Sequence, residues 1–150
     1  MNRSDMKRAM IFILLLWVMY NFYFSESPEV EFFIDGKKVT QKEFIEKGKN
    51  GTMILYYENG NKCDELAFKN GKYHGKRTSW YEDGTKSTER EYYEGKEHGK
   101  LIAWFKNGKK SCEGTFKNGK MHGKWIYWNE DGSIKREGTY NDGEFVDNKK

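Results

Sequence analysis

The sequence lacks the short motifs by which many enzymes are recognised, and it has no strong excess of charge of one sign. It contains no nucleophile elbow, no P-loop and no dinucleotide-binding fingerprint. Its 27 basic and 23 acidic residues give a formal net charge of only +4, whereas nucleic-acid binding usually needs a stronger basic excess. The sequence therefore gives no indication of an enzyme, and its charge argues against a nucleic-acid partner.

Long apolar runs are also scarce, and the one that exists lies at the N-terminus. Three basic residues precede an apolar run from Ala9 to Tyr20, which extends to Phe24. A basic flank before an apolar run is typical of a secretory signal, while the aromatic residues at its end suit a membrane interface. No cysteine is present there to carry a lipid. We therefore expect residues 1–27 to contain a hydrophobic helix that is a cleaved signal peptide or a retained membrane anchor, and either places the remaining chain in the cell envelope or outside the cell.

From about residue 51 onward, the sequence repeats with a period of 24. The spacing is kept by two series of glycines: Gly71, Gly95, Gly119 and Gly143, and Gly60, Gly84, Gly108 and Gly132. Most of these glycines follow Asn or Asp, and such steps favour the positive φ angles of hairpin turns. Turns at this spacing, flanked by short aromatic runs, predict β-hairpins in series. A fixed period indicates that each hairpin packs on its neighbours.

Other side chains recur at one phase of this repeat. The rows are Trp80, Trp104 and Trp128; Phe68, Tyr92, Phe116 and Tyr140; Glu65, Glu89, Glu113 and Glu137; Lys72, Lys96 and Lys120; Lys76, Lys100 and Lys124; and His74, His98 and His122. We interpret the tryptophans, the histidines and Gly84, Gly108 and Gly132 as structural residues of the repeat. The six lysines are a candidate contact surface, because a line of lysines could lie on acidic lipid head groups at about 1 kcal/mol each. The alternative is that the same lysines form a solvated edge of the sheet and contact no partner.

Which side chains lie on the same face of a hairpin depends on the length of the turn at Glu82-Asp83-Gly84. A three-residue loop with Gly84 in the left-handed region places Trp80 on the same face as Tyr92. In this register Trp104 lies in the packed aromatic row and Trp125 does not, so we expect Trp104→Ala to destabilise the fold more than Trp125→Ala. The opposite face would carry Leu55, Ser79, Ala103 and Tyr127. That face is smaller and more mixed, so we expect it to be solvated or to meet a partner. A two-residue loop would exchange the faces.

The sequence of residues 28–50 predicts a linker and a cap on the first hairpin. Val30 to Ile34 is a predicted strand, and Asp35-Gly36 is a predicted turn. Thr40 and Glu43 have the spacing of a capping box, which predicts a short helix that ends near Gly48. We expect Phe44 and Ile45 to lie on its inward face. Such a cap would cover a sheet edge that could otherwise recruit another chain.

The histidine and glutamate rows do not have the spacing of a metal or catalytic site. Equivalent residues of neighbouring hairpins lie two strands apart, about 10 Å, whereas zinc needs its ligands at about 2 Å. The same separation, together with flanking lysines that can neutralise the carboxylates, argues against a paired-carboxylate mechanism. We therefore expect no metal and no cofactor.

The two cysteines are not expected to form a disulfide. Cys63 and Cys112 are 49 residues apart, one more than two repeats, which places them on opposite faces and about 19 Å apart. A disulfide needs Cα atoms within about 7 Å. We expect two free thiols.

The segment from Glu113 to Gly123 resembles the MORN repeat, whose pattern runs glycine, aromatic, glycine and then a His-Gly pair. Residues 138–143 repeat its first half, while Leu66 and Arg90 replace the first glycine in earlier units. The aromatic-aromatic-x-x-Gly steps at 56–60 and 80–84 resemble the bacterial MORN variant. This resemblance implies an all-β, elongated open stack of about four hairpin repeats over residues 51–147.

The same resemblance implies a non-catalytic binding or scaffold module. With the export segment, we expect it to act at the cell envelope through protein or membrane-surface contacts, with an unknown protein as the main partner and an anionic membrane as a second. Bacterial variant proteins are often labelled antitoxins, so neutralisation of a partner toxin is the alternative. Neither label supplies residues of a site.

Overall fold

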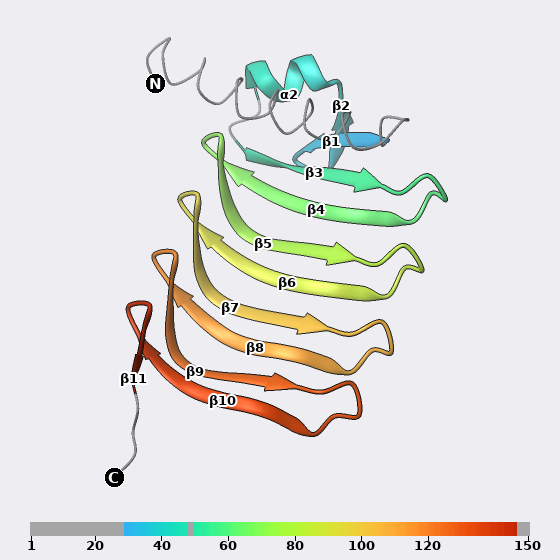
Figure 1. Cartoon of the computed structure of the whole chain (residues 1–150). Coiled ribbons are helices and arrows are strands. Elements are labelled where there is room, and N and C mark those ends of the chain that lie inside the picture. Colours follow the sequence, from blue (N-terminus) through green and yellow to red (C-terminus); the bar gives the residue numbers. More distant parts are fainter. Residues whose placement is uncertain (1–28, 48–49, 147–150) are drawn as a thin grey trace, which may run out of the picture.

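The computed structural model describes residues 29–47 and 50–146 (Figure 1). They form one open antiparallel sheet of eleven strands and one short helix. The elements are β1 (Val30–Ile34), β2 (Lys37–Val39), α2 (Gln41–Lys47), β3 (Asn50–Tyr56), β4 (Lys62–Lys69), β5 (Lys72–Trp80), β6 (Lys86–Tyr93), β7 (Lys96–Trp104), β8 (Lys110–Lys117), β9 (Lys120–Trp128), β10 (Ile134–Asn141) and β11 (Glu144–Val146). The strand order is β11-β10-β9-β8-β7-β6-β5-β4-β3-β1-β2. The predicted all-β stack of hairpins is confirmed.

The N-terminal export segment predicted for residues 1–27, including its hydrophobic helix, lies outside the described residues. Within the ranges that are described, no helix has the length and apolar character needed to cross a bilayer.

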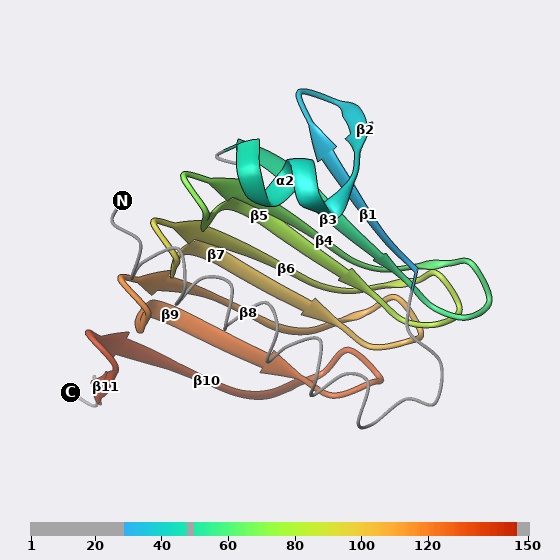
Figure 2. The same ribbon diagram turned by 90° about the horizontal axis from the view of Figure 1, so that it is seen from above.

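Two kinds of turn alternate along the sheet and gather on opposite sides of it (Figures 1 and 2). Tight turns of two residues join β4 to β5, β6 to β7, β8 to β9 and β10 to β11. Both of their residues have positive φ, as at Asn70 (51°) and Gly71 (74°), and this confirms the hairpin turns expected from the Asn-Gly and Asp-Gly steps. The Gly95 N–H also donates to the carbonyl of Tyr73 over 2.8 Å, so consecutive repeats are joined at these turns.

Wide turns join β3 to β4, β5 to β6, β7 to β8 and β9 to β10. In the second of them, the Tyr81 N–H donates to the Thr85 carbonyl over 2.8 Å, and the Gly84 N–H donates to the Tyr81 carbonyl over 2.9 Å. Gly84 has a φ of 84°, so the predicted three-residue loop is confirmed. The Tyr81 hydroxyl donates to the carbonyl of Trp104 over 2.7 Å, and the Tyr57 hydroxyl donates to the carbonyl of Trp80 over 2.8 Å, so these two wide turns are tied to the next repeat.

The face assignment made from this loop is nevertheless wrong, because a β-bulge follows the loop. Trp80 pairs with Lys86, but Ser79 pairs with Thr88, so Ser87 is an extra residue in β6. A bulge shifts the alternation of the strand by one residue. Tyr92 consequently lies on the face of Ser79, away from Trp80. The hairpin of β7 and β8 has the same irregularity.

The face that contains Ser79 and Tyr92, here called the core face, is the better-buried side of the sheet. Its ring contacts run through Phe32, Phe44, Phe68, Tyr73 and Tyr92 near the start of the stack, and through Phe116, Trp125, Tyr140 and Phe145 near its end. Trp125 is only 3% exposed, whereas Trp104 is partly exposed on the other face. The expectations that Trp104 lies in the packed row and that the Ser79 face is the solvated one are both wrong.

The cap is formed largely as predicted. The Thr40 N–H donates to Glu43 Oε2 over 3.0 Å, and the Glu43 N–H donates to Thr40 Oγ1 over 3.2 Å, so the capping box is confirmed. Phe44 is buried between Phe32 and Phe68, with ring centroids 5.0 and 5.7 Å away. Ile45 is 45% exposed, so its predicted inward position is wrong. The short edge strand β2 was not predicted from the sequence.

Candidate interaction surface

The face opposite the core face, here called the tryptophan face, is built from three parallel rows of side chains that cross the strands. The first row is Tyr56, Lys62, Trp80, Lys86, Trp104, Lys110 and Trp128. The second is Ile54, Glu65, Thr78, Glu89, Ile102, Glu113, Ile126 and Glu137. The third contains Lys76, Lys100 and Lys124. Each residue type recurs on every second strand, because the repeat contains two strands.

Lysines from the first and third rows hold the glutamates of the second. The ion pairs are Lys62–Glu65 (2.8 Å), Lys86–Glu89 (2.6 Å), Lys110–Glu113 (2.6 Å), Lys124–Glu137 (2.9 Å) and Lys76–Glu89 (3.7 Å). The hydrogen bond from Lys86 lowers the pKa of Glu89 below its ordinary value, with a smaller contribution from Lys76. The glutamates are therefore paired with lysines, as expected from the sequence, and exposed pairs of this kind contribute about 0–1 kcal/mol each.

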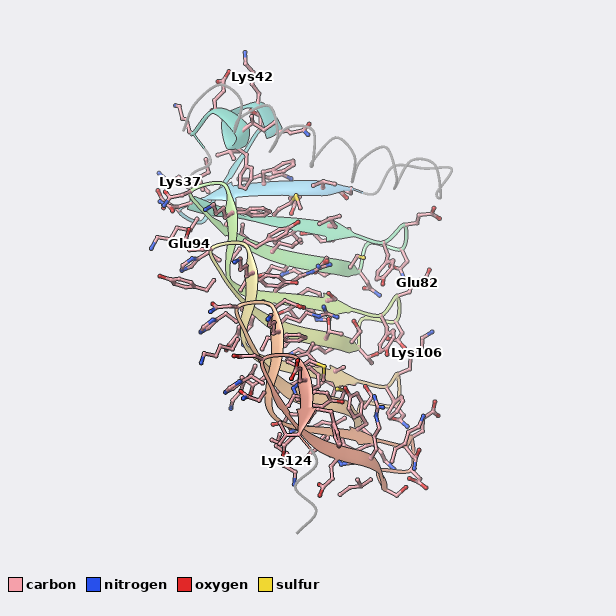
Figure 3. The ribbon with its side chains drawn as sticks, turned by 60° about the vertical axis from the view of Figure 1, so that its left-hand side comes forward. Lys37, Lys42, Glu82, Glu94, Lys106 and Lys124 are labelled. Atoms are coloured by element: carbon pink, nitrogen blue, oxygen red, sulfur yellow. The ribbon has the colours of Figure 1, made fainter. Side chains whose placement is uncertain are left out.

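All six lysines of the candidate contact surface are exposed. Lys72, Lys96 and Lys120 each begin a strand directly after a tight turn, and Figure 3 shows Glu94 of such a turn on the side opposite Glu82 and Lys106. Lys76 and Lys124 have the partners given above, and Lys72 lies 3.5 Å from Glu94.

The remaining three candidates, Lys96, Lys100 and Lys120, are not neutralised in this way. They have no carboxylate within 4.0 Å among the residues that the structure describes. The structure thus separates the six lysines into a paired half and an unpaired half, and the unpaired half retains the charge needed to attract an anion.

The three histidines lie where β5, β7 and β9 bend. Between β4 and β5, Leu66 pairs with Arg77 and Phe68 pairs with Tyr73, so the single residue Ala67 lies opposite three residues that include His74. The glycine after His74 has a φ of 91°, which permits this bend.

Each histidine faces the tight turn of the next hairpin. His74 Nδ1 lies 3.7 Å from Glu94 Oε1, and His122 Nδ1 lies 3.6 Å from Asp142 Oδ1. His98 Nδ1 lies 3.3 Å from Asn118 Oδ1 instead. No three His, Cys, Asp or Glu side chains in the described part of the chain are close enough to hold a metal ion.

The core face contains a polar cluster that was not predicted from the sequence. Asp64, which is 8% exposed, accepts hydrogen bonds from the guanidinium of Arg77 and, over 3.0 Å, from Ser79 Oγ. A second arginine, Arg90, pairs with Glu97 over 2.7 Å. Asp64 and Ser79 occupy facing positions of β4 and β5, so the cluster could have been found once the bend in β5 was known. These satisfied pairs stabilise the hairpins and leave no reactive group.

Neither the cysteines nor the surface depressions suggest chemistry. Cys63 and Cys112 are free thiols, and burial raises the pKa of both, which reduces their nucleophilic thiolate form. A depression of about 140 Å³ between Lys76 and Lys100 and another of about 210 Å³ beside Phe33 are smaller than the roughly 300–1,000 Å³ of typical small-molecule sites. The surface therefore suits contact with an extended partner better than turnover of a small substrate.

An open sheet of stacked hairpins, in which each unit packs on the next, defines a β-hairpin repeat protein of the scaffold or binding type. The model of the MORN repeat variant matches residues 49–70, 97–118 and 121–142, which lie in the hairpins β3–β4, β7–β8 and β9–β10. The chain belongs to the MORN repeat family. No curated protein matches it.

Proposed function

We propose that this repeat module acts without catalysis at the cell envelope, where the lysines at its tight turns contact an anionic membrane surface or a protein partner. The supporting observation is that Lys72, Lys96 and Lys120 are all exposed at one phase of the repeat, with no carboxylate within 4.0 Å of the last two among the described residues. Such a row can meet the phosphates of a flat bilayer, at about 1 kcal/mol for each lysine near the surface.

The envelope part of the proposal rests on the sequence of residues 1–27. Fractionation of the tagged full-length chain tests it, with the protein expected in the envelope fraction. Recovery of the protein in the soluble cytoplasmic fraction would contradict this location. That result would leave the antitoxin interpretation, in which the partner is an intracellular toxin.

The membrane-contact part is tested with residues 28–150, after circular dichroism has verified that they fold. We expect binding to vesicles that contain phosphatidylglycerol and not to neutral phosphatidylcholine vesicles. The triple reversal of Lys72, Lys96 and Lys120 to Glu should abolish this binding. A control reversal of the exposed Lys42, Lys106 and Lys135 makes the same charge change away from the tight turns between repeats.

Equal binding by the two triple variants would show that the effect is one of net charge and not of the lysine row. Loss of envelope association on removal of residues 1–27, with no vesicle binding by the folded remainder, would instead favour a protein partner.

A further inference from the structure

The aromatic residues of the tryptophan face form a strip that no described element covers. Tyr56, Trp80, Trp104 and Trp128 are the last residues of β3, β5, β7 and β9, and all four are partly exposed. The one described element outside the sheet, α2, buries Phe44 against the core face. Apart from the lysine ammonium groups over Trp80 and Trp104, the strip is therefore available to a ligand laid across the strands. Trp is one of the residue types enriched at the centres of binding surfaces.

The spacing of these rings limits the ligand. They lie on alternate strands, so consecutive rings are about 10 Å apart. An extended β-1,4-linked glycan repeats its disaccharide over nearly this length, because successive sugars are turned by half a turn. The axial C–H groups make one side of such a sugar apolar, and a flat ring can stack against it. One tryptophan per repeat thus matches one disaccharide per repeat.

The neighbouring row has the same period and the right chemistry for an acetamide group. An apolar residue or threonine stands two positions before each ring, about 7 Å along the strand: Ile54, Thr78, Ile102 and Ile126. Ile54 is buried and the other three are partly exposed, so Ile102 and Ile126 are the apolar positions that a ligand can reach. The glutamates stand between them on the intervening strands. A chain of N-acetylhexosamines presents one acetamide to the same side in every disaccharide. Its methyl group suits the apolar positions, and its N–H suits the carboxylates.

The charges next to the rings favour a neutral chain, and the one lysine of the third row without a carboxylate within 4.0 Å among the described residues, Lys100, lies apart from the rings in sequence and strand position. Lys62, Lys86 and Lys110 are each paired with a glutamate of the second row at 2.6–2.8 Å, so an acidic polymer would have to compete with those carboxylates. The ammonium groups of Lys62 and Lys86 also lie 5.6 and 5.4 Å from the ring centroids of Trp80 and Trp104. They lie over these rings, so a sugar that stacks on the same side must displace them, after which they can donate hydrogen bonds to its hydroxyl groups.

We propose that the tryptophan face binds an extended, neutral chain of β-1,4-linked N-acetylhexosamine, laid across the strands with one disaccharide on each repeat. This site is separate from the lysine row at the tight turns and does not depend on the proposed membrane contact. It needs no cavity, because the ligand is a polymer that lies along the sheet.

Titration of the full-length chain, kept in a mild detergent, with soluble chitin oligosaccharides tests the proposal. Tryptophan fluorescence and calorimetry should show binding that strengthens from the disaccharide to the hexasaccharide, since each added disaccharide reaches one more ring. Cellulose oligosaccharides of the same lengths, which lack the acetamide, should bind more weakly. Absence of hexasaccharide binding, or an affinity independent of length, would overturn the proposal.

Variants locate the site. Trp104→Ala should raise the Kd for the hexasaccharide at least about tenfold, while Trp104→Tyr, which keeps a flat ring, should retain most of the affinity. Tyr93→Ala is the matched control, because Tyr93 is an aromatic residue that is 57% exposed at a tight turn, outside the row. Melting temperatures verify that each variant is folded.

Two further outcomes are decisive. An equal loss in Tyr93→Ala and Trp104→Ala would overturn the proposal, as would self-association through the row without glycan binding. The triple reversal of Lys72, Lys96 and Lys120 should leave glycan binding unchanged, so failure of the membrane proposal and failure of this one are distinguishable.

Discussion

Both faces of the sheet carry rows of aromatic rings, but the buried rings among the described residues, Phe32, Phe44 and Trp125, all lie on the core face. Trp125 on the core face is 3% exposed and touches Phe116 and Tyr140, whereas Trp104 on the tryptophan face is partly exposed beside Lys86. The two residues have the same side chain and lie in successive repeats. Their difference shows that in a single-layer sheet the register decides which row is core and which is free to bind.

The largest expected difference between the faces is therefore in the stability that is lost when each of the two tryptophans is replaced by alanine. Trp125→Ala should lower the free energy of unfolding by roughly 3–5 kcal/mol, since it removes a large buried ring and leaves a cavity. Trp104→Ala should cost only about 1–2 kcal/mol, because much of its ring is already in contact with water. This order is the reverse of the one expected from the sequence. Urea titrations of the two variants measure it, and equal losses would show that the faces are equally buried.

A glycine on the core face gives the second comparison. Gly114 lies beside Trp125, and a Cβ atom built at Gly114 would overlap the indole ring. Gly114→Ala should therefore destabilise the fold by about 1–3 kcal/mol, because overpacking forces the ring or the backbone to move.

A double-mutant cycle with Trp125→Leu sharpens this prediction, because the smaller side chain removes the overlap. The cost of Gly114→Ala should fall markedly in that background. An unchanged cost would mean that the alanine acts through the backbone and not through the tryptophan.

The register that separates the two faces could not be read from the sequence, although the repeat could. The period, the turns at Asn70-Gly71 and Glu82-Asp83-Gly84, and the capping box of Thr40 depend on local backbone preferences, which short motifs reveal. The bulge at Ser87 depends on which residues pack across the sheet, and serine has no special preference for such a position. One unrecognised extra residue was enough to exchange the faces.

The candidate site was predictable to a similar degree. The recurrence of the lysines fixed their phase and exposure, but their ion pairs depend on diagonal contacts between strands, such as Lys76 with Glu89. The cluster of Asp64 and Arg77 required knowledge of the bend in β5, where three residues lie opposite Ala67. Long-range register, and not composition, was the missing information in each case.

The ion pairs of the two faces should also differ in strength. Asp64 is buried on the core face and binds Arg77, whose side chain is 36% exposed, so Asp64→Asn should cost about 1–2 kcal/mol. Lys110→Ala breaks the exposed pair with Glu113 on the tryptophan face and should cost less than about 1 kcal/mol. Thermal unfolding of both variants tests the difference. A larger loss for Lys110→Ala would contradict the assignment of the core face.

The smallest expected effect is the dependence of the tryptophan face on pH. The hydrogen bond from Lys86, aided by the charge of Lys76, lowers the pKa of Glu89 in the folded state below its ordinary value. A carboxyl group with a lowered folded-state pKa contributes stability that is present above its unfolded pKa, roughly 4.3. That contribution is lost as the pH falls through the folded-state value.

Glu89→Gln should therefore lower the free energy of unfolding at neutral pH by less than about 1 kcal/mol, since the pair is partly exposed. The difference between the variant and the native chain should shrink as the pH falls from above the unfolded pKa to below the folded-state value, because the native glutamate then becomes neutral as well. Added salt should reduce the difference at neutral pH, since it screens exposed pairs. Denaturant titrations across this pH range measure the effect. A difference that is constant with pH would show that Glu89 acts through packing or hydrogen bonding that does not need its charge.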